Sequence, residues 1–296
     1  VTFGEGNPLL SNKEFVNCKC PKCGLSARRE TDTMDTFFDS SWYYLRYMDA
    51  TNSKVPFDKS TVKKWLPVDQ YIGGAEHACM HLIYARFFTK ALRDMGYLDF
   101  DEPFAKLFNQ GMLHGSDGNK MSKSLGNVVN PLDVIQKYSA DSLRFNLMSL
   151  SAPNSDSVWS DNGMESAYKF LQRVYTILSE IKIGSSSKII ESKINRTIKE
   201  FTFDIENFKY NLGIIKLRSL IDAIVQEGEI SEKDLVSVLK MFSPICPHFT
   251  EEIFHERISN SMLSLENWPT CDETKIDVHL EKVEEVISSL RVDIIK

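Results

Sequence analysis

The sequence predicts an α/β portion with a parallel sheet, followed by an all-helical portion from residue 161 to residue 296. Three observations support this fold class. A strand, a helix and a second strand succeed one another between residues 68 and 113, and strands joined by a crossover helix run parallel. From about residue 164 onward, apolar residues recur at helical spacing. A Gly/Ser turn at residues 183–188 separates two of the predicted helices.

Residues 1–30 look irregular, because "GEGNPLLSN" is rich in turn residues and shows no capping residue or periodic run. Cys18, Cys20 and Cys23 follow in "CKCPKCG", which resembles one knuckle of a zinc ribbon. Zinc binds four ligands, and the sequence has no second C-x-x-C. We therefore predict a connector that carries at most a partial zinc site. Residues 31–48 are predicted to form a strand and a short helix.

The next stretch predicts a compact strand–helix–strand unit. Residues 68–72 favour a strand, residues 73–74 a Gly-Gly turn, and residues 76–95 a helix that Gly96 closes. Residues 105–113, "AKLFNQGML", favour the second strand. A glycine turn before a helix N-terminus suits a nucleotide phosphate. The sequence contains neither G-x-G-x-x-G nor the P-loop pattern, so this signal is weak.

His77 and His81 lie four residues apart, on one face of the predicted helix. Glu76 precedes both histidines, whereas a zincin needs the order H-E-x-x-H. The metalloprotease interpretation therefore fails. A structural hydrogen-bonding pair and a substrate pocket both stay open.

A basic loop, "GNKMSKSLGN" at residues 118–127, follows the second strand. Lys/Ser/Gly runs are commonly exposed turns. Two ammonium groups three residues apart, with small residues between them, can also surround a polyphosphate. Gly118 and Gly126 would let such a loop move. The residues predict a phosphate-binding mobile loop or an exposed turn. Asn130 and Pro131 then begin a helix.

The helical portion is predicted to contain helices from about residue 164, over 190–208, over 209–226 and over 231–257, the last bent at "SPICP". Several cations in this portion could form a stripe that contacts nucleic-acid phosphates, or could be solvated helix faces. They are Lys193, Arg196, Lys199, Lys209, Lys216 and Arg218.

Composition excludes some classes of protein. The chain has 35 Lys and Arg against 41 Asp and Glu, a net charge of −6. This argues against a protein that coats nucleic acid indiscriminately, but allows a local basic stripe. The sequence shows no apolar run of the roughly 18 residues that span a bilayer, so no membrane partner is expected. Clustered cysteines in a long chain fit a reducing compartment, and the expected location is the cytoplasm.

Three motifs carry a resemblance. "KMSKS" (residues 120–124), "YIGGAEHACMHLIYARF" and "ETDTMDTFFDSSWYYLRY" together resemble the class I aminoacyl-tRNA synthetases, and the leucyl-tRNA synthetases in particular. The resemblance extends from about residue 4 to residue 270. It implies that residues 31–160 are the second half of a Rossmann-like catalytic domain. Residues 161–296 are then an α-helical, anticodon-binding-type domain. The segments "SPICPHFTEEIF" and "NWP" resemble the end of such a domain in the family.

The resemblance also implies roles for single residues. A mobile loop that holds the ATP phosphates is implied for Lys120, Ser122 and Lys123. An ATP-binding wall is implied for Gly73, Gly74, Glu76, Gln110 and Met112. A leucine pocket is implied for Phe37, Ser40, Tyr43, His77 and His81. The six cations of the helical portion would contact tRNA.

The implied reaction begins with ATP and Mg²⁺ as a substrate complex. The leucine carboxylate attacks the α-phosphate, pyrophosphate leaves, and the leucyl group then passes to the terminal ribose of tRNA(Leu). No side chain need act as a nucleophile, because positioning and electrostatics supply the rate.

Two features of the family are absent from the sequence, the His-Ile-Gly-His signature and the editing insert. We therefore expect the C-terminal part of a synthetase, as a separate subunit or a fragment, which needs an N-terminal half to be active. Synthetases for isoleucine, valine or methionine are the alternative on substrate. A non-catalytic tRNA-binding paralogue is the alternative on activity, and the retention of both loop lysines, Gly-Gly-Glu and the pocket aromatics disfavours it.

Overall fold

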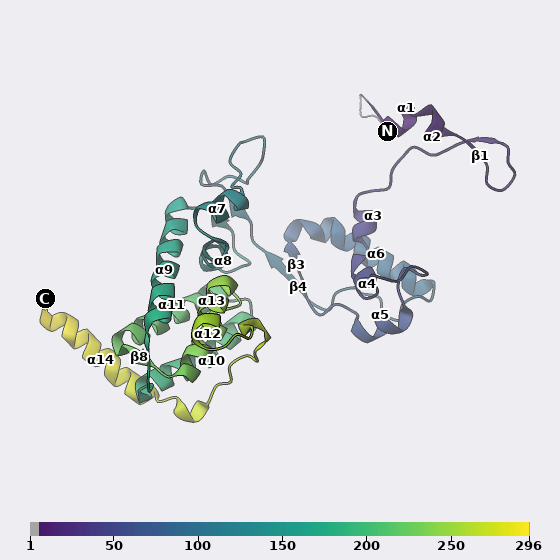
Figure 1. The fold of residues 1–296 in the computed structure, drawn as a ribbon. Helices are drawn as coiled ribbons and strands as arrows, with labels where there is room; N and C mark the ends of the chain where they lie inside the picture. Colours follow the sequence, from purple (N-terminus) through teal and green to yellow (C-terminus); the bar gives the residue numbers. More distant parts are fainter. Residues whose placement is uncertain (1–5, 296) are drawn as a thin grey trace. The chain divides into compact units, whose positions relative to one another are not determined.

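The computed structural model describes residues 6–295 of the chain. It contains two compact units, residues 1–108 and residues 109–296. Figure 1 colours the first from purple to blue and the second from teal to yellow. The domain division predicted at residue 160 stays a prediction. Within residues 6–295, no helix combines the length and the apolar character needed to cross a membrane.

The first unit begins with two one-turn helices and a hairpin. Asn7 and Asn12 cap these helices, because each side-chain oxygen accepts a backbone N–H of the turn that follows. The prediction of an irregular, uncapped segment is therefore wrong. The two strands pair antiparallel, with Cys18 opposite Ala27. The elements are α1 (Pro8–Ser11), α2 (Lys13–Val16), β1 (Asn17–Lys19) and β2 (Ser26–Arg28).

Short helices follow, so the strand predicted within residues 31–48 is wrong. Threonine is the only β-branched residue type in that stretch, so the stretch lacks the Val and Ile that favour a strand. The elements are α3 (Phe37–Ser40), α4 (Tyr43–Tyr47) and α5 (Lys59–Trp65). They enclose a core made of Tyr44, Leu45, Phe57, Val62, Leu66, Ala85 and Leu98.

The predicted strand–helix–strand succession is confirmed. It consists of β3 (Tyr71–Gly74), α6 (His81–Asp94) and β4 (Leu107–Gln110), and β3 and β4 are neighbours in one sheet. A parallel bridge joins Val68 to Phe104 just before the two strands. Figure 1 shows α6 beside this pair.

Two local predictions in this unit need correction. Gly73 and Gly74 end strand β3 and do not form a turn. The α-helix begins at His81, because a 3₁₀ segment (Ala75–Cys79) and Met80, with φ −121° and ψ −106°, come first. Gly96, with φ +76°, follows the helix as predicted for a C-terminal glycine.

The second unit continues the α/β architecture over a short distance. Strand β5 (Leu113–His114) pairs parallel with β6 (Ser157–Val158), so the strand predicted over residues 105–113 is divided between β4 and β5. Helices α7 (Pro131–Lys137) and α8 (Ala140–Ser149) lie between them in the sequence. The side chain of Asn130 accepts the Leu132 backbone N–H, as predicted for an N-cap.

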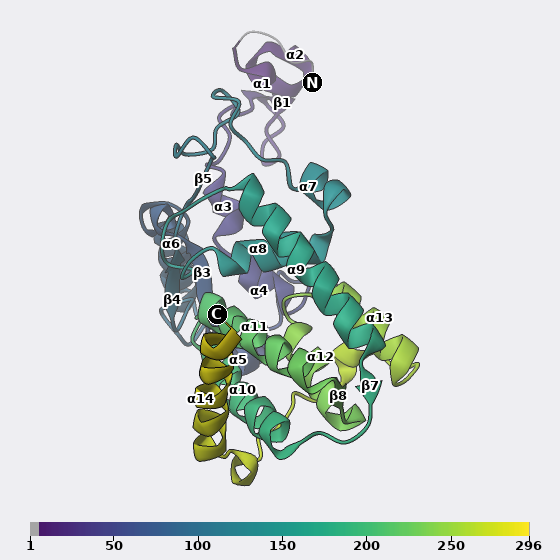
Figure 2. The same ribbon diagram turned by 90° about the vertical axis from the view of Figure 1, so that its left-hand side faces the viewer.

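The rest of the second unit is helical, as predicted. One long core includes the fully buried Phe201, Leu217 and Leu239. The helix predicted over 231–257 is two helices, because Pro247 begins a new one. A parallel pair of two-residue strands, β7 (Lys182–Ile183) and β8 (Glu229–Ile230), joins the helix ends. The helices are α9 (Asp161–Glu180), α10 (Lys188–Glu206), α11 (Tyr210–Glu227), α12 (Glu232–Phe242), α13 (Pro247–Arg257) and α14 (Val278–Ile295). Figure 2 shows α14 beside α10.

Candidate functional site

A buried histidine is fixed between two partners in the first unit. His81 Nε2 lies 2.7 Å from the Ser40 carbonyl oxygen, and its Nδ1 lies 3.2 Å from the Tyr71 hydroxyl. A carbonyl can only accept, so Nε2 carries the proton and Nδ1 accepts from Tyr71. Burial lowers the pKa of His81 below its ordinary value of 6.5, and the nearby His77 adds to the effect. His81 is therefore a neutral, oriented wall residue at pH 7.

Aromatic rings surround this histidine. The Tyr71 ring stacks on it at 5.5 Å between centroids, and the Tyr43 ring lies at 5.8 Å. The His77 ring meets both His81 and Phe37 edge-on, at 6.0 and 6.2 Å. The structure thus brings together the five residues for which the sequence predicts a leucine pocket, although His77 and His81 come from different helical segments.

His77 has unused hydrogen-bonding capacity. Its Nδ1 is buried and has no hydrogen-bond partner within residues 6–295. Buried polar atoms are normally paired, so an unpaired one in an aromatic wall is available to a polar group of a ligand.

The glycines at the end of β3 permit a close approach. A Cβ on Gly73 would lie 2.8 Å from the Tyr71 ring, and one on Gly74 would lie 2.3 Å from the Glu76 carboxylate. A Cβ at either position would displace one of these side chains, so the glycines let Tyr71 and Glu76 lie against the strand end. These residues belong to the first unit.

Gln110 and Met112, predicted for the same ATP-binding wall, belong to the second unit. Gln110 is exposed at the end of β4. The backbone N–H of Met112 donates to the Asp156 carboxylate at 2.7 Å, and this bond lowers the pKa of Asp156. Gly111 between them passes close to the 153–155 backbone, and its N–H donates to Pro153 at 2.8 Å.

The predicted phosphate loop begins with a tight turn. The Gly115 N–H donates to the Asn119 carbonyl, and an antiparallel bridge pairs His114 with Lys120. Gly118 has φ +77°, a conformation that glycine adopts without strain. The turn therefore fixes the position at which the lysines start.

The loop is closed by side-chain bonds that sequence analysis missed. The Asn127 amide oxygen accepts the Ser122 N–H at 2.8 Å, and its amino group donates to Asp117 at 3.2 Å. Backbone and side-chain donation from Asn119 and Asn127 lowers the pKa of Asp117. The loop is thus braced at its base by its last residue, and the "GN" at residues 126–127 was the available signal.

The two lysines of the loop are exposed, and neither has an ion-pair partner in the described part of the chain. Met121 between them is half-buried and packs against a core cluster of Leu143, Trp159 and Met164. The loop therefore combines free cationic ends with an apolar anchor. Two ammonium groups without carboxylate partners can accept a polyphosphate without first breaking a salt bridge.

The cysteines of the first hairpin do not form a complete metal site. The backbone N–H groups of Cys23 and Lys22 lower the pKa of the Cys20 thiol, and this favours the thiolate that metals bind. Within residues 6–295, however, no three His, Cys, Asp or Glu side chains are grouped as metal ligands. Cys18, Cys20 and Cys23 by themselves do not meet the four-ligand requirement of zinc.

Most of the predicted tRNA-contacting cations have partners in the structure. Arg196 pairs with the buried Glu281 at 2.6 Å, Lys199 with Glu273, and Lys216 with Asp204. Arg218 covers the Phe170 ring at 4.0 Å, and Lys209 covers the Phe203 ring at 4.8 Å. Lys193, Arg196 and Lys216 line one cavity of about 230 Å³ between α10 and α11. Their tRNA contacts stay a prediction.

The sequence comparisons point to one family. A family model described as "tRNA synthetases class I (I, L, M and V)" matches residues 11–160. A second, "Anticodon-binding domain of tRNA ligase", matches residues 187–295. The chain is 44% identical to the leucine–tRNA ligase of Oleidesulfovibrio alaskensis over 294 residues, 90% of this chain and 35% of the relative. It is 43% identical to that of Thermosipho melanesiensis, over 97% of this chain and 37% of the relative.

Solved structures agree. The ternary complex "Agrobacterium radiobacter K84 agnB2 LeuRS-tRNA-LeuAMS" matches 94% of this chain and 38% of its own, with a TM-score of 0.81 and 36% identity. Mycobacterium tuberculosis methionyl-tRNA synthetase matches with a TM-score of 0.54 and 16% identity, which shows a shared fold. The chain spans about a third of the length of the curated relatives that it matches. The predicted fold class, a class I catalytic portion followed by an anticodon-binding-type helical domain, is confirmed.

Proposed function

Because this chain belongs to the class I tRNA synthetases of the isoleucine, leucine, methionine and valine group, we propose that it is the C-terminal portion of a leucine–tRNA ligase. In this proposal it contributes the ATP-phosphate loop and part of the leucine pocket to leucyl-adenylate formation and to the charging of tRNA(Leu). A further portion with the His-Ile-Gly-His signature completes the site. The same polypeptide or a separate subunit could supply it.

The observation that best supports this proposal is the loop with two lysines that have no ion-pair partner. Lys120 and Lys123 are exposed on either side of the anchored Met121, on a loop braced through Asn127. When the leucine carboxylate attacks the α-phosphate of Mg-ATP, negative charge moves onto the departing pyrophosphate. Ammonium groups placed at those oxygens stabilise the transition state more than the ground state. Mg²⁺ enters with ATP as part of the substrate.

The proposal that the amino acid is leucine rests on residues of the first unit. The wall of Phe37, Tyr43 and His81 suits a branched apolar side chain, and the unpaired His77 Nδ1 offers one polar contact. Isoleucine, valine and methionine are chemically close, and a hydrophobic pocket separates such side chains by only about 1–3 kcal/mol. Substrate exchange therefore belongs in the test.

The test is amino-acid-dependent ATP–pyrophosphate exchange, with this chain alone and joined to a His-Ile-Gly-His portion. The joined enzyme is expected to exchange pyrophosphate with leucine and much less with the other three amino acids. Lys120→Ala and Lys123→Ala are each expected to slow exchange by about 10²–10³-fold, while tRNA binding is retained. Lys54→Ala is the matched control, because Lys54 is exposed outside the loop.

Unchanged exchange in both loop variants would overturn the role of the loop. Exchange that prefers another amino acid would move the proposal to that synthetase. Absence of exchange in the joined enzyme, with tRNA still bound, would instead favour the non-catalytic tRNA-binding paralogue.

A further inference from the structure

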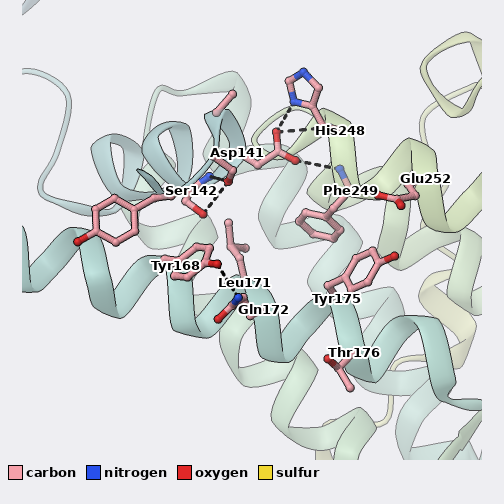
Figure 3. Close-up of a pocket in the computed structure, with 13 residues that line it drawn as sticks. Asp141, Ser142, Tyr168, Leu171, Gln172, Tyr175, Thr176, His248, Phe249 and Glu252 are labelled. Atoms are coloured by element: carbon pink, nitrogen blue, oxygen red, sulfur yellow. Dashed lines mark hydrogen bonds and ion pairs between the residues drawn. The ribbon is translucent and has the colours of Figure 1, made fainter. Parts of the chain in front are cut away.

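A cavity of about 530 Å³ lies within the second unit, among α8, α9 and α13. Its walls are the N-terminal turn of α8, one face of α9 and the first turns of α13 (Figure 3). Tyr138, Tyr168 and Tyr175 contribute aromatic surface and are each half-buried. The Tyr138 and Tyr168 rings meet at 5.5 Å between centroids. The cavity thus has room and ring surface for a flat group.

The cavity combines hydroxyl groups, which can donate or accept, with the acceptor-only carboxylates of Asp141 and Glu252. Gln172 donates its amino group to the Tyr168 hydroxyl at 2.7 Å, which leaves its carbonyl oxygen without a hydrogen-bond partner among residues 6–295. Glu252 has no ion-pair partner in the described chain. Burial, together with the carboxylates of Glu252 and Glu256, raises the pKa of Tyr175. The Glu252 carboxylate favours a ligand that supplies N–H donors at that point, and it would repel a phosphate inside the cavity.

Only a few biological groups are flat, apolar on their faces and rich in N–H donors at their edges. Unpaired nucleobases are one such group, and proteins recognise them by stacking on tyrosine and by hydrogen bonds to their edges. Two segments that form the walls also lie in regions matched by tRNA synthetase family models. Helix α8 lies in the region matched by the class I synthetase family, and α13 lies in the region matched by the anticodon-binding family.

We propose that this cavity receives one unpaired nucleobase of the tRNA, with its ring against Tyr168 and an exocyclic amino group directed to Glu252. The inference rests on the proposed function, because it requires that this chain binds tRNA. Lys137, whose ammonium group lies 4.8 Å above the Tyr138 ring, is on the same rim and is placed for the phosphate that follows the base.

The test uses the whole chain and a tRNA(Leu) transcript. Affinity is measured by fluorescence anisotropy, and the Watson–Crick edges of unpaired bases are mapped by chemical footprinting. Tyr168→Ala is expected to weaken binding by about 10-fold, the order of one stacked base, and to expose one base that the unmodified chain protects. Tyr168→Phe keeps the ring and should keep both affinity and footprint. Glu252→Gln should weaken binding without removing the stacked ring, and it also serves if Tyr168→Ala fails to fold.

Trp65→Ala is the matched control, since Trp65 is exposed on the first unit, far from this cavity in sequence. Equal affinities and identical footprints for Tyr168→Ala, Glu252→Gln and the unmodified chain would overturn the inference and leave the proposed function standing. A chain that does not bind the transcript at all would overturn both the tRNA-binding part of the proposed function and the inference.

Discussion

The Asp141 carboxylate on α8 accepts a 2.9 Å hydrogen bond from the backbone N–H of Phe249, in the first turn of α13. The same carboxylate lies 2.7 Å from the His248 side chain and is almost completely buried (Figure 3). A carboxylate at a helix N-terminus satisfies free N–H groups and matches the positive end of the helix dipole. One turn later on α8, Arg144 donates to the carbonyls of Pro244 and Ile245. Helix α8 therefore holds both sides of the α12–α13 corner.

Removal of this carboxylate should destabilise the second unit. Asp141→Ala leaves the part-buried N–H groups of His248 and Phe249 without this acceptor, and we expect the free energy of unfolding to fall by about 2–3 kcal/mol. Asp141→Asn keeps one acceptor and should cost roughly half as much. Urea denaturation followed by circular dichroism measures both. Asp32→Asn is the control, because Asp32 is exposed, and midpoints that match this control would contradict the capping role.

Two glycines should respond to alanine in opposite ways. A Cβ on Gly111 would lie 2.2 Å from the Ser155 carbonyl oxygen, so the backbone must shift and Gly111→Ala should destabilise by about 1–3 kcal/mol. A Cβ on Gly163, in the first turn of α9, meets its nearest atoms at an ordinary 3.5 Å. Gly163→Ala should therefore stabilise by up to about 1 kcal/mol. Thermal unfolding of the two variants measures both effects. Midpoint temperatures that shift in the same direction would contradict the opposite roles of the two glycines.

The buried His81 should make folding stability depend on pH. Its pKa is lowered in the folded chain, chiefly by burial, so the unfolded chain binds more protons below pH 6.5. Stability is then complete above pH 6.5 and is lost as pH falls through the folded pKa. Urea unfolding at several pH values between 5 and 8 should show this slope, and His81→Gln should reduce it. His279→Gln, at an exposed position, should leave the slope as it is.

The Asn127 brace should matter for ATP rather than for stability. Asn127→Ala removes the acceptor of the Ser122 N–H and a donor to Asp117. The loop that carries the two lysines is then no longer held in position at its base. In the joined enzyme of the proposed function, we expect the KM for ATP in pyrophosphate exchange to rise about 10-fold, the value of one lost hydrogen bond of roughly 1.4 kcal/mol. Asn162→Ala, at an exposed position on α9, should have no effect. An unchanged KM in Asn127→Ala would show that the brace is dispensable.

Local signals in the sequence predicted much of the fold. Asn130 and Pro131 marked a helix start and Gly96 a helix end, because these residues act within one turn of the backbone. The same kind of signal was missed at Asn7 and Asn12, which cap helices too short to show any periodicity.

Features that depend on distant residues could not be predicted in this way. The helix start at His81 is set by the unusual backbone of Met80, and the bond of His81 to Ser40 joins residues 41 positions apart. The Asp141–Phe249 bond spans 108 positions. For the candidate site, the motifs indicated which residues come together, while the bonds by which Tyr71, Asp117 and Asn127 orient them were not predicted.

The burial of Met121 has a consequence for how the loop handles charge. Three residues of extended chain span at most about 10–11 Å, so the Cα atoms of Lys120 and Lys123 lie within that distance of each other, and Met121 between them packs on Leu143, Trp159 and Met164. Both side chains therefore start close together on an anchored loop, and one polyphosphate can bind the two ammonium groups at once. Its binding should weaken with ionic strength more steeply than binding to one lysine would.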